Sequence, residues 1–225
     1  MALYPIFVET AGRRVIVIGG GNVGAEKVRG LLAAEAEITV VSPDLIPELQ
    51  EEKDAGRIRH VARAYEEADL DGGYEFIMVA TDDGAINAEV AAAGKRRGIW
   101  VNAADDPKHC DFILPSVVRK GKITLAASTS GTSPALARRL REELDAYLTE
   151  DMPALADLLA EVRQAMRARG IKVDSDRWQE AIDEQLRVLL AQRKHVQARA
   201  RLVAGLGIEL PPLDDGTAVA ARGGE

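Results

Sequence analysis

Residues 15–24 read VIVIGGGNVG, a run of β-branched residues that passes directly into glycines. The spacing of Gly19, Gly21 and Gly24 satisfies G-x-G-x-x-G, between an expected strand and an expected helix. In that setting the first glycine permits a tight turn, the second lets a phosphate approach the backbone, and the third lets the helix lie against the strand. The sequence therefore predicts a dinucleotide-binding loop, with Asn22 and Val23 beside the phosphates at the helix N-terminus.

Strand-like and helix-like runs alternate over the first hundred residues. Strands are expected at 14–20, 37–42, 58–65, 74–83 and 99–107, and helices at 24–35, 46–56 and 85–98. Alternation of this kind implies a parallel sheet with right-handed crossovers. We therefore expect an α/β domain of Rossmann type over residues 1–113.

The pattern changes after Pro107. Residues 112–129 indicate two strands around a basic turn at 119–122, and residues 131–144 a helix with Ser133 as N-cap and Pro134 at its first position. These features define a small mixed segment at 114–150. Residues 151–208 have the pattern of a helical domain, and residues 209–225 carry too little apolar content to pack, which predicts a disordered tail.

Composition narrows the partners. Lys plus Arg number 29 and Asp plus Glu 36, a net charge of −7 that argues against nucleic acid as the main partner. Cys110 is the single cysteine, so no internal disulfide forms and a reducing compartment is expected. The N-terminus does not read as a signal peptide, and no apolar run reaches the ~20 residues of a spanning helix. We expect a cytoplasmic protein without membrane contact.

The second strand ends where a ribose-binding acid is needed. Asp44 lies 20 residues after Gly24, and Ser42 and Pro43 precede it. No Lys or Arg lies between Glu35 and Glu52 to receive a 2′-phosphate, which favours NAD over NADP. Three polar residues at the ends of later strands are also expected at the cofactor: Thr81, Asp82 and Asn102. The alternatives are a glycine turn that only packs tightly and an Asp44 that only solvates its loop.

The segment after the fifth strand carries a more specific signal. In order, the chain holds YPIFVETAGRRVIVIGGGNVGAEK, VATDD, NAADDP, FILPS and STSGTSPALAR, which together cover roughly residues 4–145. These motifs strongly resemble the dehydrogenases of siroheme synthesis: the precorrin-2 dehydrogenases and the N-terminal module of siroheme synthase.

The resemblance implies NAD-dependent oxidation of precorrin-2 to sirohydrochlorin. Some members of the family also insert ferrous iron to make siroheme, so iron is a further expected substrate. The resemblance also implies a homodimer formed through residues 114–150. It places the catalytic aspartate at Asp105, which completes NAAD.

Several polar groups cluster at the exit of the fifth strand, the side on which open α/β sheets bind ligands. His109 is a second acid–base candidate, and the alternative is an exposed turn histidine. Asp106 is expected to cap the turn at Pro107, and Cys110 to pack. Because His60 and His195 lie far away in sequence, we expect no metal site.

A polycarboxylate substrate requires local positive charge in an acidic protein. Arg119 and Lys120 begin the basic stretch, and Arg138, Arg139 and Arg141 continue it. The hydroxyl run leads into a helix N-terminus and offers donors to a carboxylate: Ser128, Thr129, Ser130, Thr132 and Ser133. The alternative for the arginines is a solvated face paired with Glu142 and Glu143.

Two other functions fit part of the sequence. An NAD-sensing regulatory module would explain the glycine loop and Asp44, although not the later motifs. A metal chelatase that uses NAD only structurally would take up iron without turning NAD over. Formation of NADH separates both from a dehydrogenase.

Overall fold

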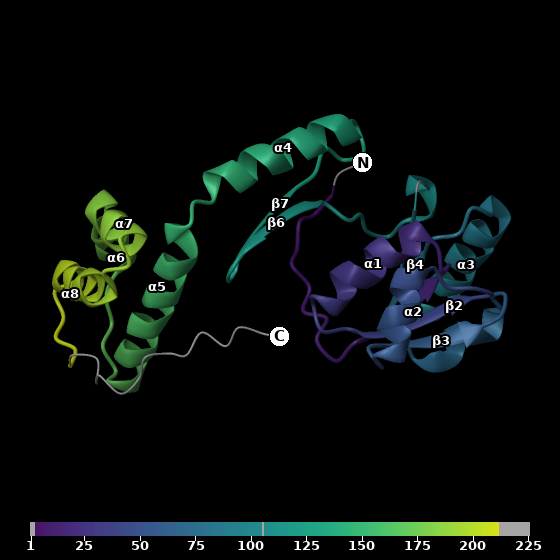
Figure 1. Ribbon diagram of the computed structural model, residues 1–225, viewed down its shortest axis with the longest axis horizontal. Coiled ribbons are helices and arrows are strands. Elements are labelled where there is room, and N and C mark those ends of the chain that lie inside the picture. The colour runs from purple at the N-terminus through teal and green to yellow at the C-terminus, as the bar shows by residue number, and fades with distance from the viewer. Residues whose placement is uncertain (1–2, 105, 212–225) are drawn as a thin grey trace. The chain divides into compact units, whose positions relative to one another are not determined.

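The computed structural model describes residues 3–104 and 106–211. Two compact units divide the chain between Leu114 and Pro115. The first unit alternates strands with helices, as the sequence predicts (Figure 1). Its elements are β1 (Arg14–Ile18), α1 (Asn22–Leu32), β2 (Glu37–Ser42), α2 (Pro47–Asp54), β3 (Ile58–Ala62), η1 (Glu67–Gly72), β4 (Phe76–Val79), α3 (Gly84–Arg97), β5 (Trp100–Ala103) and η2 (Pro107–His109).

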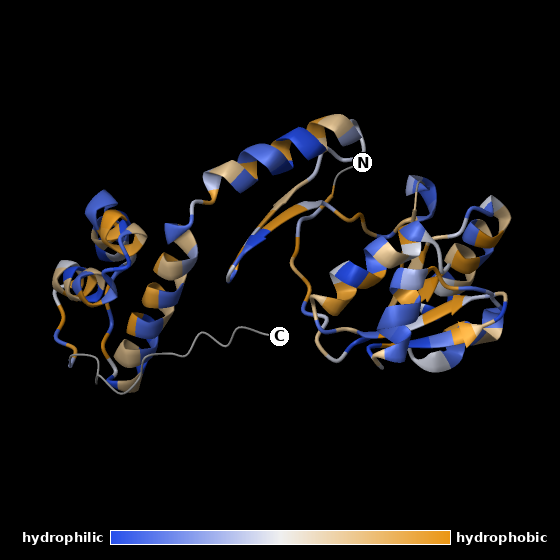
Figure 2. Ribbon diagram, viewed as in Figure 1, coloured by the Kyte–Doolittle hydropathy of each residue, from blue (hydrophilic) through white to orange (hydrophobic). Residues whose placement is uncertain are grey.

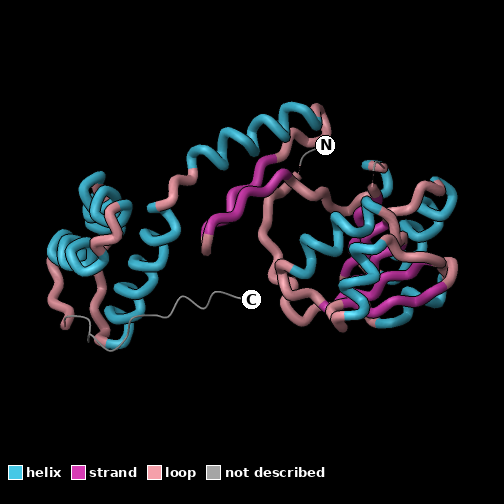
Figure 3. The backbone as a smooth tube through the Cα atoms, viewed as in Figure 1, coloured by secondary structure: helices cyan, strands magenta, loops and turns pink. Residues whose placement is uncertain are grey.

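The five strands lie together in one parallel sheet (Figure 3). Their order across the sheet is β3-β2-β1-β4-β5. The order reverses beside β1, because the chain first adds β2 and β3 on one side and later β4 and β5 on the other. In an open sheet, the crevice outside the carboxyl ends of the strands at such a reversal is where ligands bind. The predicted Rossmann-type fold is confirmed.

Alternate residues of β1 feed two separate cores. Val15 and Val17 pack with Val28 of α1 on one face of the sheet. Ile16 and Ile18 pack with residues of α3 on the other. The hydrophobic strands therefore lie between helices with hydrophilic outer faces (Figure 2).

Up to residue 211, the second unit contains an antiparallel ribbon and five helices. They are β6 (Ser116–Lys120), β7 (Ile123–Ala127), α4 (Pro134–Tyr147), α5 (Asp151–Ala168), α6 (Ser175–Ala181), α7 (Glu184–Ala191) and α8 (His195–Leu206). Leu158, Val162 and Leu202 lie in a buried cluster built by α5 to α8. Within the described residues, no helix combines the length and apolarity needed to cross a membrane.

Element boundaries differ from expectation at several points. Helix α1 begins at Asn22, two residues earlier than the pattern indicates, and β5 stops at Ala103. The short 3-10 helix η1 is unexpected, and the helical domain divides into four helices. The Ser133 N-cap is confirmed, because its hydroxyl accepts the Leu136 N–H at 3.2 Å. Of the tail expected at 209–225, residues 212–225 lie outside the described part, and the division at 150/151 stays an expectation.

Candidate functional site

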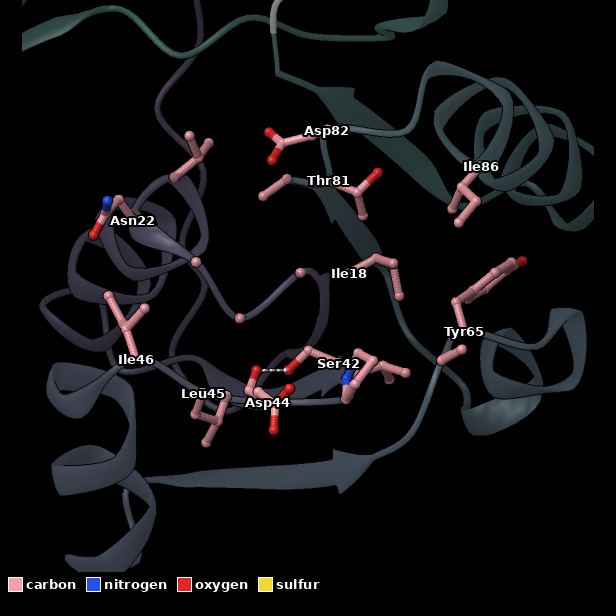
Figure 4. Close-up of a pocket in the computed structure, with 18 residues that line it drawn as sticks. Ile18, Asn22, Ser42, Asp44, Leu45, Ile46, Tyr65, Thr81, Asp82 and Ile86 are labelled. Carbon is pink, nitrogen blue, oxygen red and sulfur yellow. Dashed lines mark hydrogen bonds between the residues drawn. The ribbon is translucent and has the colours of Figure 1, made fainter.

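A cavity of about 690 Å³ opens at the carboxyl ends of the strands in the first unit (Figure 4). Three segments supply most of its lining: the glycine loop at 18–23, the β2–α2 turn at 41–46, and the end of β4 at 80–82. Ala64, Tyr65 and Ile86 complete it. The structure therefore brings together nearly all of the residues that the sequence assigns to a cofactor.

Close backbone approaches explain two of the glycines. Gly19 has φ +120°, and a Cβ there would lie 2.3 Å from the Ala80 carbonyl oxygen. A Cβ at Gly24 would lie 2.2 Å from the Gly19 carbonyl oxygen. A larger residue at either position would force the loop away from β4 or the helix away from the loop. Both roles agree with those that the motif predicts.

Gly21 differs, because a Cβ there would meet no atom within 4 Å. It is the N-cap of α1 and makes no side-chain capping bond, and none of the described side chains accepts a hydrogen bond from the first turn of that helix. Free backbone N–H groups and the positive end of the helix dipole therefore face open space inside the cavity lining. This cradle fits a dinucleotide pyrophosphate, and the backbone of Gly21, Asn22 and Val23 would hold it.

Gly20 is a site residue that the sequence analysis missed. A Cβ there would lie 2.2 Å from the Asp44 carbonyl oxygen, so only glycine fits against the β2–α2 turn. The Ile46 N–H donates to the Gly20 carbonyl at 3.0 Å, and the Ser42 hydroxyl donates to the Asp44 carbonyl at 2.8 Å. The turn that carries Asp44 is thus tied to the glycine loop.

Asp44 is exposed and lines the cavity together with Ser42 and Pro43. No Lys or Arg is among the lining residues that the structure describes. A carboxylate accepts hydrogen bonds from ribose hydroxyls and repels a 2′-phosphate. The lining therefore fits NAD better than NADP.

Polar residues at the end of β4 form the far wall of the cavity. The Thr81 hydroxyl donates to Asn87 Oδ1 at 2.6 Å, and the Asn87 amide donates to the Thr81 carbonyl at 3.2 Å. Asp83 caps α3 by accepting the N–H groups of Ala85 and Ile86. Asp82 remains exposed at the rim. The Thr81 side chain is therefore engaged with Asn87 and stabilises this wall of the cavity. A cofactor there would contact the Thr81 backbone and the Asp82 side chain.

Tyr65 was also missed by the sequence analysis. Its ring lines the cavity, and its hydroxyl end points away from the glycine loop (Figure 4). Burial raises the pKa of Tyr65 to about 12, and its hydroxyl lacks a hydrogen-bond partner among the described residues. The sequence analysis expected β3 to continue to residue 65, so Tyr65 was placed within a strand and not considered at the binding edge. A strand ending at Ala62 would have placed Tyr65 at the binding edge.

The end of β5 presents a different arrangement from the one expected. Asp105 lies outside the described residues. Asp106 occupies the N-cap position of η2, but its side chain makes no capping bond and instead meets His109 Nδ1 at 2.5 Å. The expected cap at Pro107 is therefore wrong. Asn102 is buried, and its amide donates to the Phe112 carbonyl at 2.9 Å. Its side chain therefore contacts the segment that follows η2 and does not line the cavity.

Cys110 is partly buried and packs against the α3 side of the sheet. Its sulfur accepts the Ala103 N–H at 3.2 Å, and burial raises the pKa of the thiol. These contacts confirm a packing role. Among the described residues, no group of three or more His, Cys, Asp or Glu side chains is arranged to hold a metal ion.

The residues expected at the substrate lie in the second unit. Lys120 donates to the Leu148 carbonyl at 2.7 Å and the Asp145 carbonyl at 3.2 Å, so its ammonium closes the C-terminus of α4. Arg119 is exposed. In the loop before α4, the Thr129 hydroxyl donates to the Ser133 carbonyl, and the Ser128 hydroxyl accepts the Ser130 N–H. Ser130 and Thr132 are exposed.

Comparison with known protein families matches both units. Residues 6–116 match a family described as putative NAD(P)-binding, and residues 120–147 match the central part of the sirohaem biosynthesis proteins. The first unit is therefore an NAD(P)-binding domain.

Curated relatives are named siroheme synthase. The protein of Photorhabdus laumondii is 35% identical over 204 residues, which cover 90% of this chain and 43% of that protein. The protein of Methylobacillus flagellatus is 40% identical over 169 residues, which cover 75% of this chain and 36% of that protein. The chain thus spans less than half the length of these relatives.

One solved structure matches over its whole length. It is that of SirC, a precorrin-2 dehydrogenase, with a TM-score of 0.71 and 31% identity. The match covers 88% of this chain and 100% of that chain. With the glycine-lined cavity and the matched central segment, this likeness shows that the chain belongs to the precorrin-2 dehydrogenase family.

Proposed function

We propose that this chain oxidises precorrin-2 to sirohydrochlorin with NAD⁺ as the hydride acceptor. The observation that carries the proposal is the glycine-lined cavity with Asp44 at the ribose position and no described basic residue in its lining. The likeness to SirC, which covers 88% of this chain and all of that one, supports the choice of substrate.

NAD⁺, when bound, supplies the acceptor for a hydride. The chain supplies the geometry: the loop backbone holds the pyrophosphate, Asp44 holds the adenosine ribose, and the end of β4 lies on the side of the reacting ring. Asp82 stands at the rim there. The oxidation also releases a proton, so a base is required near the ends of β4 and β5. The two candidates that we assign to this step are those that the sequence analysis names, Asp105 and His109.

The substrate is a polyanion, and the second unit offers the donors. Arg119, Ser130 and Thr132 are exposed and are the side chains we assign to its carboxylates. We do not assign Lys120 to the substrate carboxylates, because its ammonium already donates a hydrogen bond to the Leu148 carbonyl at the end of α4. Ser128, Thr129 and Ser133 shape the loop through their internal hydrogen bonds.

We further propose a homodimer formed through residues 114–150. The ribbon β6–β7 is a two-stranded sheet, which is marginally stable on its own in water. Helix α4 has no buried residue, and Leu136 and Tyr147 are 50% and 65% exposed. A second copy of this segment would cover both elements.

An anaerobic assay with precorrin-2 and NAD⁺ tests the function. Formation of NADH together with the sirohydrochlorin spectrum supports it, whereas NAD binding without NADH would indicate the regulatory module instead. Ferrous iron added afterwards tests for siroheme formation. Iron uptake without any need for NAD turnover would indicate a chelatase.

A further inference from the structure

An aspartate and a histidine form a close pair immediately after β5. Asp106 Oδ2 lies 2.5 Å from His109 Nδ1, and both side chains are partly exposed. An ionised carboxylate only accepts hydrogen bonds, so the imidazole must donate from Nδ1. This fixes the neutral tautomer whose lone pair lies on Nε2, the form of a general base.

The residues that directly follow the pair are hydrogen-bonded to β5. The Asp111 carboxylate accepts the Val101 N–H at 3.0 Å, and the Asp111 N–H donates to the Val101 carbonyl at 2.8 Å. The Asn102 amide and the Cys110 sulfur add the bonds described above. These bonds fix the backbone next to His109, and the contact with Asp106 orients its ring, as a catalytic base requires.

The pairing sets Asp106 apart from the other acids of the chain. Across residues 3–104 and 106–211, every other described ion pair joins an acid to Arg or Lys, and only this one joins an acid to histidine. The hydrogen bond from His109 lowers the pKa of Asp106, so the carboxylate stays ionised at neutral pH. The sequence expectation of a capping residue gives no reason for this arrangement.

Asp106 and His109 lie outside the lining of the cavity, on the side toward which the reacting half of the cofactor would extend. Asp44 at the end of β2 marks the adenosine side, so the other half extends toward β4 and β5 across the reversal in strand order. Strands β4 and β5 are parallel neighbours, so the turn after β5 lies on the same edge of the sheet as Thr81 and Asp82.

We infer that Asp106 is a positioning residue that orients His109 as the base for the oxidation. The inference rests on the proposed function. One hydrogen leaves the substrate with its bonding electron pair as hydride to NAD⁺. A second leaves as a proton to His109 Nε2, and the imidazolium then returns that proton to water. The products are oxidised substrate, NADH and one proton.

Among the described residues, few other charges lie near the Asp106–His109 pair, and Lys27 of α1 is close enough to act on the neighbouring Cys110. Lys108 and Asp111 belong to the same segment, and β5 carries no ionisable side chain. Helix α3, which also packs against η2, has Asp83 at its N-cap and Glu89 within it, and Arg96 and Arg97 at its far end pair with residues of η1. Loss of activity on acidification is therefore expected to depend on His109.

A double-mutant cycle tests the inference. We expect His109→Gln to lower kcat about 10- to 100-fold and to remove the acid limb of the pH profile, with NAD affinity unchanged. Asp106→Asn should lower kcat about tenfold in the wild type and less than twofold in the His109→Gln background, because Asp106 acts only through His109. Asp106→Glu, which keeps the carboxylate, should recover part of the loss. His195→Gln, an exposed histidine at the start of α8, is the matched control.

Two results would overturn the inference. One is a wild-type pH profile in His109→Gln, and the other is an equal loss from Asp106→Asn in both backgrounds. An NMR titration of the His109 ring, with and without Asp106→Asn, reports on the pair without any need for turnover. If that titration responds to the substitution but no variant, nor the wild type, forms NADH, the proposed function fails while the pairing stands.

Discussion

The two units bury their apolar residues in different ways. In the first, Val15, Ile16 and Val17 have no exposed surface, and helices of the same chain cover both faces of the sheet. In the second, α5 to α8 build a core, but β6 and β7 contribute only Val118 to the buried set and α4 contributes no residue. The first unit is therefore complete as a folded layer structure, whereas the ribbon and α4 depend on further contacts.

The largest expected effect separates binding from folding in the first unit. Gly21→Asp should weaken NAD affinity at least about 100-fold, to the point where binding is no longer measurable. The reason is that a carboxylate would occupy the position of the phosphates. The unit should still fold, because a Cβ at Gly21 meets no atom within 4 Å. Isothermal calorimetry measures the loss, and circular dichroism checks the fold.

Gly30→Asp is the matched control for that substitution. Gly30 lies on α1, and a Cβ there also meets no atom within 4 Å, but it is far along the helix from the loop. Its NAD affinity should stay within about twofold of the wild type. Unchanged affinity in a folded Gly21→Asp protein would show that the cofactor binds elsewhere.

The next effect addresses the incomplete part of the second unit. Leu136→Glu should weaken the proposed homodimer about thirtyfold or more, because a charge would replace a half-exposed apolar side chain on α4. Sedimentation velocity at micromolar concentration should then show a monomer. Glu142→Gln on the same helix should leave the dimer intact, and a monomeric wild type would refute the assembly.

The difference between the units also explains what the sequence could predict. The buried strands and the amphipathic helices of the first unit have regular hydrophobic patterns that a single sequence reveals. The spacing of the glycines likewise indicates close backbone approaches that only glycine allows. Helix η1 was missed because Asp69 is held by Arg63 and by the Glu66 N–H, contacts without hydrophobic periodicity. The ends of strands were misjudged where polar residues continue the alternation.

The cofactor part of the site was largely predictable, whereas its supporting contacts were not. Asp44 follows from spacing, but Gly20 depends on which turn the loop touches, and that is a tertiary fact. Lys120 belongs to a basic run in the sequence, yet its ammonium closes α4 in space. Asp106 and His109 are three residues apart, and only the η2 turn brings their side chains together.

A smaller effect tests whether the second unit depends on its own ion pair. Asp151 is 8% exposed and accepts from Arg187 Nε at 2.8 Å, which joins α5 to α7. Asp151→Ala should lower the free energy of unfolding of this unit by about 1–2 kcal/mol, because Arg187 loses its carboxylate partner and keeps only its bond to Thr149. Asp157→Ala is the control on the same helix, since its pair with Lys122 is exposed and should contribute less than about 0.5 kcal/mol.

This effect should depend on pH. The hydrogen bond from Arg187 lowers the pKa of Asp151 in the folded protein. The stabilisation is therefore fully present above the unfolded value of about 3.9, and it is lost as pH falls through the lower folded value. Urea unfolding at pH 7 and pH 3 should show the difference between wild type and Asp151→Ala shrinking at the acidic pH. A difference that grows on acidification would contradict the assignment.

The smallest expected effect concerns the ribose position. Asp44→Ala should weaken NAD about five- to tenfold, because one charged acceptor is lost while the pyrophosphate cradle at Gly21 remains. The same change should reduce the preference for NAD over NADP, because the Asp44 carboxylate would no longer repel a 2′-phosphate. Asp54→Ala, at the exposed end of α2, should alter neither affinity. Calorimetry with both dinucleotides measures these affinities. A gain in NAD affinity on Asp44→Ala would show that Asp44 does not bind the ribose. An unchanged NADP affinity would show that the preference for NAD over NADP arises outside the β2–α2 turn.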